Sequence, residues 1–255
     1  MNSTIQYCSD LHLEFSDNRA YIKNNPIIAK CDILLLAGDI IPFSMLDKFD
    51  WFFDEISGQF ETVYWIAGNH EYYGADIKER SGSFFEPIRE NVFLVNNFSV
   101  EVGSTTIILS TLWSKISEVN KLSIQYGMND FRHIRFGSRI FNPTDCNTLF
   151  NENLAFLEEE LLKIKKNQKV VVVTHHVPTY YNYPEKYKHS VLNDAFATEL
   201  DSFMRRFSID YWIYGHSHSN TPDFKLGNTV LTNNQLGYVG YNEHLNYKDC
   251  KELEL

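Results

Sequence analysis

Five short polar motifs, each directly behind an apolar run, constrain the fold of this chain more than any other feature of its sequence. In chain order the motifs are Asp10-Leu11-His12, Gly38-Asp39, Gly68-Asn69-His70-Glu71, His175 and Gly215-His216-Ser217-His218. The runs that precede them have the composition of buried strands and cover residues 4–8, 33–36, 63–66, 170–173 and 211–214. Ligand sites of open α/β sheets assemble at the carboxyl ends of the strands. We therefore predict that these distant motifs converge on one site.

The order of the patterns indicates an α/β fold. Strand-like runs alternate with helical patterns through the first hundred residues, and Phe49, Phe52 and Ile56 recur at helical spacing. The turn Val102-Gly103-Ser104 predicts a β-hairpin, so part of a sheet should be antiparallel.

Two helices and one irregular segment are expected in the second half. A stripe at residues 150, 154, 157, 161 and 164 predicts a long helix that ends in Lys163, Lys165 and Lys166. A second helix is expected from Asp194, as N-cap, to Arg206. Residues 113–142 show no clear period and suggest a loop that covers the site. Because no linker or repeat is visible, residues 1–255 are expected to form a single domain.

Charge and cysteine content narrow the class of protein. The formal net charge of -10 argues against a general affinity for nucleic acid, although a local basic patch would be compatible with it. The four cysteines form no CxxC pair and are expected to be free thiols. No long apolar segment or basic-then-apolar N-terminal pattern is present, so we expect no membrane association and a cytoplasmic location.

The polar motifs supply a mixed nitrogen and oxygen ligand set. Such a set suits manganese, iron or zinc better than calcium, and seven candidate ligands exceed what one tetrahedral zinc needs. The candidates are Asp10, His12, Asp39, Asn69, His175, His216 and His218. Two metal ions sharing a carboxylate would use this set naturally.

The motif order D-x-H, G-D, G-N-H-[DE], H and G-H-x-H closely resembles the calcineurin-like metallophosphoesterase superfamily, over most of the chain. The resemblance implies a four-layer α/β/β/α sandwich, in which two mixed sheets are flanked by helices. It also implies one metal on Asp10, His12 and His218, a second on Asn69, His175 and His216, and Asp39 bridging them. His70 would be the catalytic histidine.

The activity implied by this resemblance is hydrolysis of a phosphomonoester or phosphodiester by attack of a metal-bridging hydroxide. Manganese is the first candidate for the two cations, with iron or zinc as alternatives. The substrate is expected to be a small phosphorylated molecule. The segment after Gly38-Asp39 lacks the second Asp and the Arg of the family's protein phosphatases, so that activity is not expected, and the residue that orients His70 is left open.

Three other functions fit parts of the pattern. A nuclease of the same superfamily would use the same ligands but should have a basic groove, which the net charge disfavours. A non-catalytic metal-binding interaction scaffold, or a protein with purely structural metal ions, would not need His70. Oligomeric state is not indicated.

Several residues near the motifs have more than one interpretation. His176 either lies near the site or is merely packed, and Glu71 either begins a turn or supports the loop by hydrogen bonds. A tyrosine cluster either lines a pocket or covers a loop, and a polar group in 113–142 offers candidate substrate contacts. The tyrosines are Tyr180, Tyr181, Tyr183 and Tyr187, and the polar candidates are Asn129, Asp130, Arg132 and Arg135.

Overall fold

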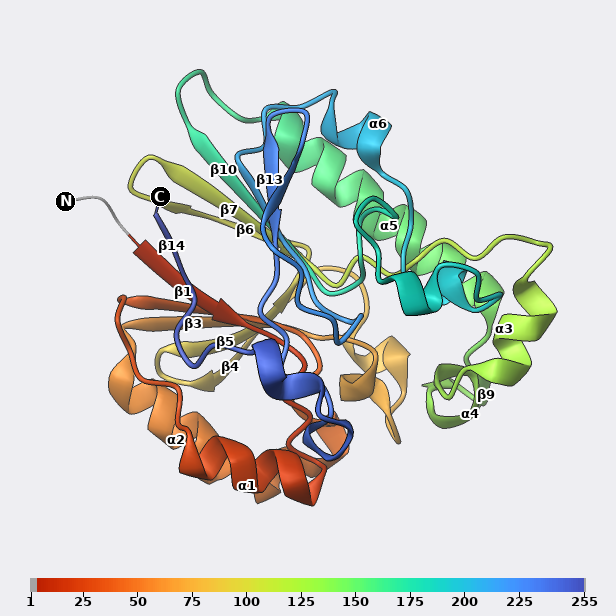
Figure 1. Cartoon of the computed structure of the whole chain (residues 1–255), viewed down its shortest axis with the longest axis horizontal. Coiled ribbons are helices and arrows are strands. Elements are labelled where there is room, and N and C mark those ends of the chain that lie inside the picture. The colour runs from red at the N-terminus through yellow and green to blue at the C-terminus, as the bar shows by residue number, and fades with distance from the viewer. Residues whose placement is uncertain (1–3, 255) are drawn as a thin grey trace.

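Two six-stranded sheets form the centre of the computed structural model, which describes residues 4–254 (Figure 1). Their strand orders are β14-β1-β2-β3-β5-β4 and β12-β13-β11-β10-β7-β6, and β8 pairs with β9 in a small third sheet. The strands are β1 (Thr4–Cys8), β2 (Ile33–Ala37), β3 (Thr62–Ile66), β4 (Phe84–Arg89), β5 (Val92–Asn96), β6 (Phe98–Val102), β7 (Thr105–Ser110), β8 (Arg135–Phe136), β9 (Arg139–Ile140), β10 (Lys169–Thr174), β11 (Tyr211–Ile213), β12 (Phe224–Leu226), β13 (Thr229–Thr232) and β14 (Glu252–Glu254).

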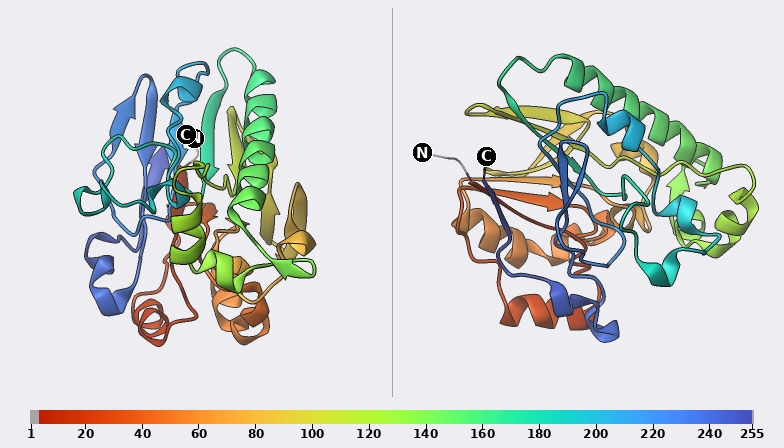
Figure 2. Two further views of the ribbon diagram at one scale, coloured as in Figure 1. Left: turned by 90° about the vertical axis from the view of Figure 1, so that its right-hand side faces the viewer. Right: turned by 45° about the horizontal axis from the view of Figure 1, so that its top comes forward.

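Helices cover the outer faces of both sheets. The first sheet carries α1 and α2, and the second carries α5, while α3 and α4 lie together at one end of the molecule (Figures 1 and 2). The α-helices are α1 (Ser16–Asn24), α2 (Asp50–Gln59), α3 (Lys121–Gly127), α4 (Asp130–His133), α5 (Pro143–Leu162) and α6 (Asp201–Met204). The predicted α/β fold with two mixed sheets flanked by helices is confirmed.

A buried apolar layer joins the two sheets. In β2, Leu35 and Ala37 belong to a buried cluster that also contains Ile107 of β7 and Val171 of β10. The alternate residues Leu34 and Leu36 belong to the outer core, under the helices. Because successive side chains of a strand point to opposite faces, a strand buried on both faces needs a continuous apolar run. This requirement explains the runs that precede the polar motifs.

Parallel pairing brings the motif-bearing strand ends to one edge. In the first sheet β1, β2, β3 and β5 are parallel, and in the second β7, β10, β11 and β13 are parallel. The antiparallel strands β14, β4, β12 and β6 lie at the sheet edges. The predicted hairpin is β6–β7, with Gly103 in its turn at a φ of 60°.

The helix predicted over 194–206 is wrong in its extent. Only a 3₁₀ turn at Asn193–Ala195 and the short α6 form there. Asp194 is not an N-cap, because its carboxylate accepts hydrogen bonds from the Ser117 backbone and the Asn120 amide. Phe196 stacks on His216, at 4.7 Å between ring centroids. These tertiary contacts hold the segment in an irregular path that helical spacing alone did not reveal.

The other two expectations for the second half need smaller corrections. The long helix exists as α5 but ends at Leu162, so Lys163, Lys165 and Lys166 follow it. Residues 113–142 contain α3, α4 and the β8–β9 pair, so this segment is more ordered than a simple loop.

All four cysteines are free thiols, as predicted. Within residues 4–254, no helix has both the length and the apolar character needed to cross a membrane.

The start of α5 yields a first testable prediction. The Asn142 side chain accepts hydrogen bonds from the Thr144 and Asp145 backbone N–H groups, and the Asp145 carboxylate accepts one from the Asn142 backbone. This capping box satisfies donors that the helix itself cannot. We expect Asn142→Ala to lower the free energy of unfolding by about 1 kcal/mol in urea denaturation. Thr144→Ala, at an exposed neighbouring position, should change it by less than about 0.5 kcal/mol; equal losses would contradict the role of the cap.

Candidate metal centre

The structure brings all seven predicted ligand residues together at the carboxyl ends of the parallel strands. Ligand atoms of Asp10, His12, Asp39 and His218 form one group within 4.8 Å of one another, and Asp39, His175 and His216 form a second. The Asn69 side-chain oxygen adjoins the second group, 3.3 Å from His175 Nε2. Asp39 is common to both groups.

The two oxygens of Asp39 face different groups. Oδ2 lies 3.6 Å from His12 Nε2, and Oδ1 lies 3.4 Å from His175 Nε2. The side chain is 1% exposed, so these imidazoles replace water around its charge. The adjacent histidines lower the pKa of Asp39 even though burial alone would raise it. A carboxylate in this position can serve two cations at once.

Hydrogen bonds at Nδ1 fix the orientation of three histidines. His175 Nδ1 donates to the carbonyl oxygen of Ala37 at 2.9 Å, and His218 Nδ1 donates to Glu243 at 2.8 Å. His12 Nδ1 likewise lies within hydrogen-bond distance of a carboxylate, 3.3 Å from Glu14 Oε1. A neutral imidazole that donates through Nδ1 keeps its lone pair on Nε2. In this neutral tautomer the three Nε2 atoms, which point into the ligand groups, would carry the lone pairs that metal-binding histidines require.

The spacing of the ligand nitrogens tests whether cations fit. His12 Nε2 lies 2.9 Å from His218 Nε2, and His175 Nε2 lies 3.1 Å from His216 Nδ1. Two nitrogens bound to one ion, each at about 2.0–2.1 Å, lie roughly 3 Å apart. The described residues therefore fit a divalent cation in each group.

Backbone conformation at the ligands is unusual. Five of the seven have positive φ values: Asp10 (57°), His12 (46°), Asp39 (56°), His216 (71°) and His218 (47°). Residues other than glycine rarely occupy this left-handed region, and each costs on the order of 1–3 kcal/mol where the surroundings enforce it. The fold thus uses strained backbone to aim these side chains.

Glu71 holds the loops that carry Asp39 and Asn69. It is fully buried, and its carboxylate accepts hydrogen bonds from the backbones of Asp39, Ile40 and Gly68 and from the Trp65 indole. Of the two interpretations, support of the loop by hydrogen bonds is the correct one. Close packing here also requires glycine: a Cβ at position 68 would lie 2.2 Å from Asp39 Oδ1.

Asp130 was a candidate substrate contact, but it does not line the cavity. It orients Asn69 instead. It is 2% exposed, and its carboxylate accepts hydrogen bonds from Asn69 Nδ2 at 2.8 Å and from the Tyr73 hydroxyl at 2.7 Å. Because Nδ2 is occupied in this way, the Asn69 oxygen is turned toward His175.

His70, the predicted catalytic histidine, lies beside both groups. Its Nδ1 donates to Glu14 Oε1 at 2.8 Å, and its Nε2 lies 3.4 Å from the Tyr238 hydroxyl. The ring stacks on Tyr73, with centroids 4.2 Å apart. Burial acts against a charged imidazole, but the carboxylates of Asp39 and Glu14 outweigh it and raise the pKa of His70. Glu14 is the orienting group that the sequence left open.

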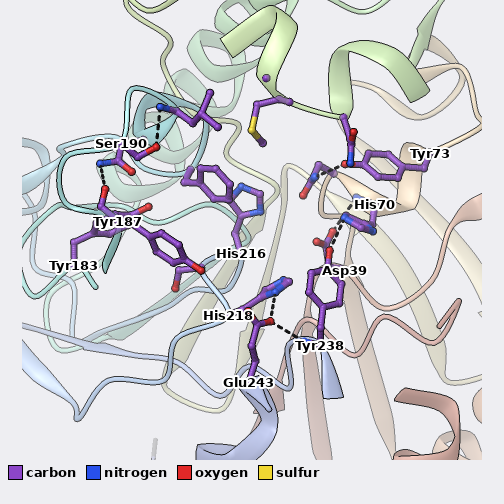
Figure 3. A pocket seen from close by; sticks show the side chains of 18 residues that line it. Asp39, His70, Tyr73, Tyr183, Tyr187, Ser190, His216, His218, Tyr238 and Glu243 are labelled. Atoms are coloured by element: carbon purple, nitrogen blue, oxygen red, sulfur yellow. Dashed lines mark hydrogen bonds and ion pairs between the residues drawn. The ribbon is translucent and has the colours of Figure 1, made fainter. Parts of the chain in front are cut away.

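A cavity of about 350 Å³ opens over the site. His216 and His218 lie between His70 and Tyr73 on one side and Tyr183, Tyr187 and Ser190 on the other (Figure 3). The lining also includes Gly127, Met128 and Asn129, so part of segment 113–142 reaches the site.

Only some of the other candidate residues line the cavity. Tyr183 and Tyr187 line the cavity, but Tyr180 and Tyr181 do not. Arg132 and Arg135 do not line it either; Arg132 donates to the backbone oxygen of Tyr126, and Arg135 is exposed on β8. His176 is buried behind His216, at 4.3 Å between ring centroids, outside the cavity lining.

Three residues beside the ligand groups were not predicted from the sequence. Glu14, Tyr238 and Glu243 belong to no motif, and the last two follow the final motif by about twenty residues. Glu14 had one available signal, its position two residues after His12. Tyr238 and Glu243 reach the site because the chain returns after β13, which no local pattern indicated.

The fold and the site together define a class: an α/β sandwich with clustered histidine and aspartate groups that can bind metal ions. The family model of the calcineurin-like phosphoesterases matches residues 4–220. The chain belongs to this family, and it is a hydrolase of phosphoric esters.

Proteins similar to this chain occur in a virus, a bacterium and a fish. An uncharacterized protein of Acanthamoeba polyphaga mimivirus is 30% identical over 282 residues, covering 98% of this chain and 97% of its own. The crystal structure of phosphopantetheinyl hydrolase from Mycobacterium tuberculosis has a TM-score of 0.71 at 16% identity, covering 99% and 96% of the two chains. A dimetal phosphatase from Danio rerio has a TM-score of 0.52 at 13% identity, covering 91% and 87%. At these identities the two solved structures support the fold alone.

Glu71 gives a second testable prediction. A glutamine keeps one carbonyl oxygen, so its NH₂ group would face two of the four N–H donors that now reach the carboxylate. We expect Glu71→Gln to lower the free energy of unfolding by about 1–3 kcal/mol in urea denaturation. Glu152→Gln, at an exposed position of α5, is the matched control and should be nearly neutral. Equal stability of the two variants would show that the buried carboxylate does not hold the loops.

Proposed function

We propose that this protein hydrolyses a phosphomonoester or phosphodiester at a centre of two divalent metal ions. The observation that carries the proposal is the pair of ligand groups that share Asp39. Asp10, His12 and His218 would hold one ion, Asn69, His175 and His216 the other, and Asp39 both. The mixed nitrogen and oxygen set favours manganese, with iron or zinc as alternatives.

The protein's own residues complete the chemistry. When bound, two such cations activate a water molecule, orient the phosphoryl group and neutralise its charge. His70 lines the cavity next to Asp39 and Asn69, so it can contact the phosphoryl group or the leaving oxygen. With Nδ1 bound to Glu14, its Nε2 is the atom available to donate a proton to the leaving alcohol.

Glu14 would act through His70. Its Oε1 accepts the Nδ1 hydrogen bond, which fixes the ring and favours the protonated imidazole. The carboxylate itself stays ionised, because hydrogen bonds from His12 and His70 outweigh burial and lower the pKa of Glu14 to about 2. A His–carboxylate pair is thus assembled from the loops after β1 and β3.

Metal content and turnover, measured together, test the proposed centre. We expect the purified protein to hold two metal ions per chain after manganese addition, by elemental analysis, and to hydrolyse aryl phosphate monoesters or diesters. Asp39→Ala should lose metal and activity together. His70→Ala should retain the metal while kcat for alkyl esters falls about 10²–10⁴-fold.

The control for these variants is His189→Ala, an exposed histidine outside the ligand groups, which should keep both metal content and activity. Full metal content without turnover of any ester would favour a scaffold or a structural metal site. Preferential cleavage of single-stranded or duplex DNA would favour a nuclease.

A third prediction concerns Glu14 and uses the acidity of the leaving alcohol. If Glu14 orients a proton donor, Glu14→Ala should reduce kcat for alkyl esters by about 10–100-fold and for p-nitrophenyl esters much less, because p-nitrophenolate leaves without a proton. Glu14→Gln, whose amide oxygen can still accept from Nδ1, should recover part of the loss. His70→Ala should show the same dependence, and the loss in the double variant should be smaller than the product of the two single losses. Equal losses for both ester types at full metal content would contradict this role.

A further inference from the structure

The cavity beyond the ligand groups has walls of distinct chemistry. Its floor consists of Asp39, Asn69, His70, His216 and His218. Above this floor, the walls are mainly aromatic or aliphatic. The wall residues of this kind are Tyr73, Met128, Tyr183, Tyr187, Leu192, Phe196 and Tyr238.

Charge is scarce on these walls. Among residues 4–254, no lysine or arginine lines the cavity. Glu243 is the one acidic lining residue outside the floor, and its carboxylate is paired with His218 at 2.8 Å. A second phosphate or a carboxylate of a substrate would therefore meet no cationic side chain there, and an unpaired charge is costly to move out of water.

The apolar walls come from separate segments that meet across the floor. Tyr183, Tyr187 and Phe196 belong to the stretch between β10 and β11, whereas Met128 follows α3 and Tyr73 follows β3. Figure 3 shows Tyr183 and Tyr187 opposite Tyr73, with the ligand histidines between them. A cavity of about 350 Å³ falls within the usual range of small-ligand pockets, about 300–1,000 Å³. A flat ring can contact these walls while a phosphoryl group rests on the floor.

We infer that the substrate is a phosphoric ester with one uncharged, planar aromatic group, held by the tyrosine walls next to the floor. The inference rests on the proposed phosphoesterase function and adds the class of substrate. The phosphoryl group is the anionic part that the site accommodates, and the rest of the molecule is recognised by stacking and apolar contact. Stacking of a base on an aromatic side chain strengthens binding about 5- to 150-fold.

Substrate pairs whose leaving groups are of the same kind test this assignment. Adenosine monophosphate and ribose 5-phosphate both release a primary alcohol but differ in the aromatic base, and naphthyl phosphate is compared with phenyl phosphate in the same way. With the manganese-loaded protein, we expect kcat/KM to be about 5- to 150-fold higher for the member with the larger aromatic group. The pair with the greater ratio distinguishes a nucleobase from a simple aryl group. Adenosine triphosphate, which carries additional charge, should be a poorer substrate than the monophosphate.

Variants of the walls connect the preference to the cavity. Tyr183→Ala and Tyr187→Ala should reduce the ratio toward one, because kcat/KM for adenosine monophosphate falls more than kcat/KM for ribose 5-phosphate, at unchanged metal content. Tyr187→Phe should keep the ratio, and so should Tyr126→Ala, at an exposed tyrosine outside the cavity. Ratios near one in the wild type, ratios unchanged by both alanine variants, or a preference for the triphosphate would overturn the inference.

The two proposals fail in different ways. If no ester is hydrolysed, the proposed function fails, and calorimetric titration of the same ligand pairs into His70→Ala still measures the aromatic preference. If esters are hydrolysed without that preference, the proposed function stands and the substrate class is wrong.

Discussion

The apolar layer between the two sheets is the constraint on which the rest of this structure depends. Ile107 and Val171 from the second sheet pack there against Leu35 and Ala37 from the first. Because this packing aligns both sets of parallel strand ends along one edge, each sheet supplies part of the ligand set. The hydrogen bond from His175 to the Ala37 backbone crosses from one sheet to the other. A change in the spacing of the sheets would thus move the two ligand groups relative to each other.

Four carboxylates outside the ligand set hold the site in place through hydrogen bonds to the ligand residues, to His70 and to the loops that carry them. Glu243 and Glu14 fix imidazole rings, Asp130 turns the Asn69 amide, and Glu71 holds two loops through four hydrogen bonds. Each of these carboxylates accepts at least one hydrogen bond from an N–H or O–H donor of the protein. Supporting contacts of this type keep metal ligands in one tautomer and one orientation, which is why they matter as much as the ligands.

The sequence allowed the strands, and the meeting of the seven proposed ligand residues at their ends, to be predicted because the motifs directly follow apolar runs. An apolar run followed by a polar residue marks the end of a buried strand, as at Leu36 and Asp39. Glu243 and Tyr238 were missed because their contacts depend on the return of the chain after β13, which has no local pattern. The helix expected from Asp194 failed for a related reason: its contacts with Ser117 and Asn120 are long-range. Spacing rules describe a helix by itself and carry no information about such partners.

The left-handed backbone of the ligands has a consequence for the stability of this protein. At His12, His216 and His218 a positive φ is strained for any residue but glycine, yet glycine would also remove a largely buried imidazole and its packing. The strained backbone is therefore a cost of placing these imidazoles where the proposed metal binding needs them.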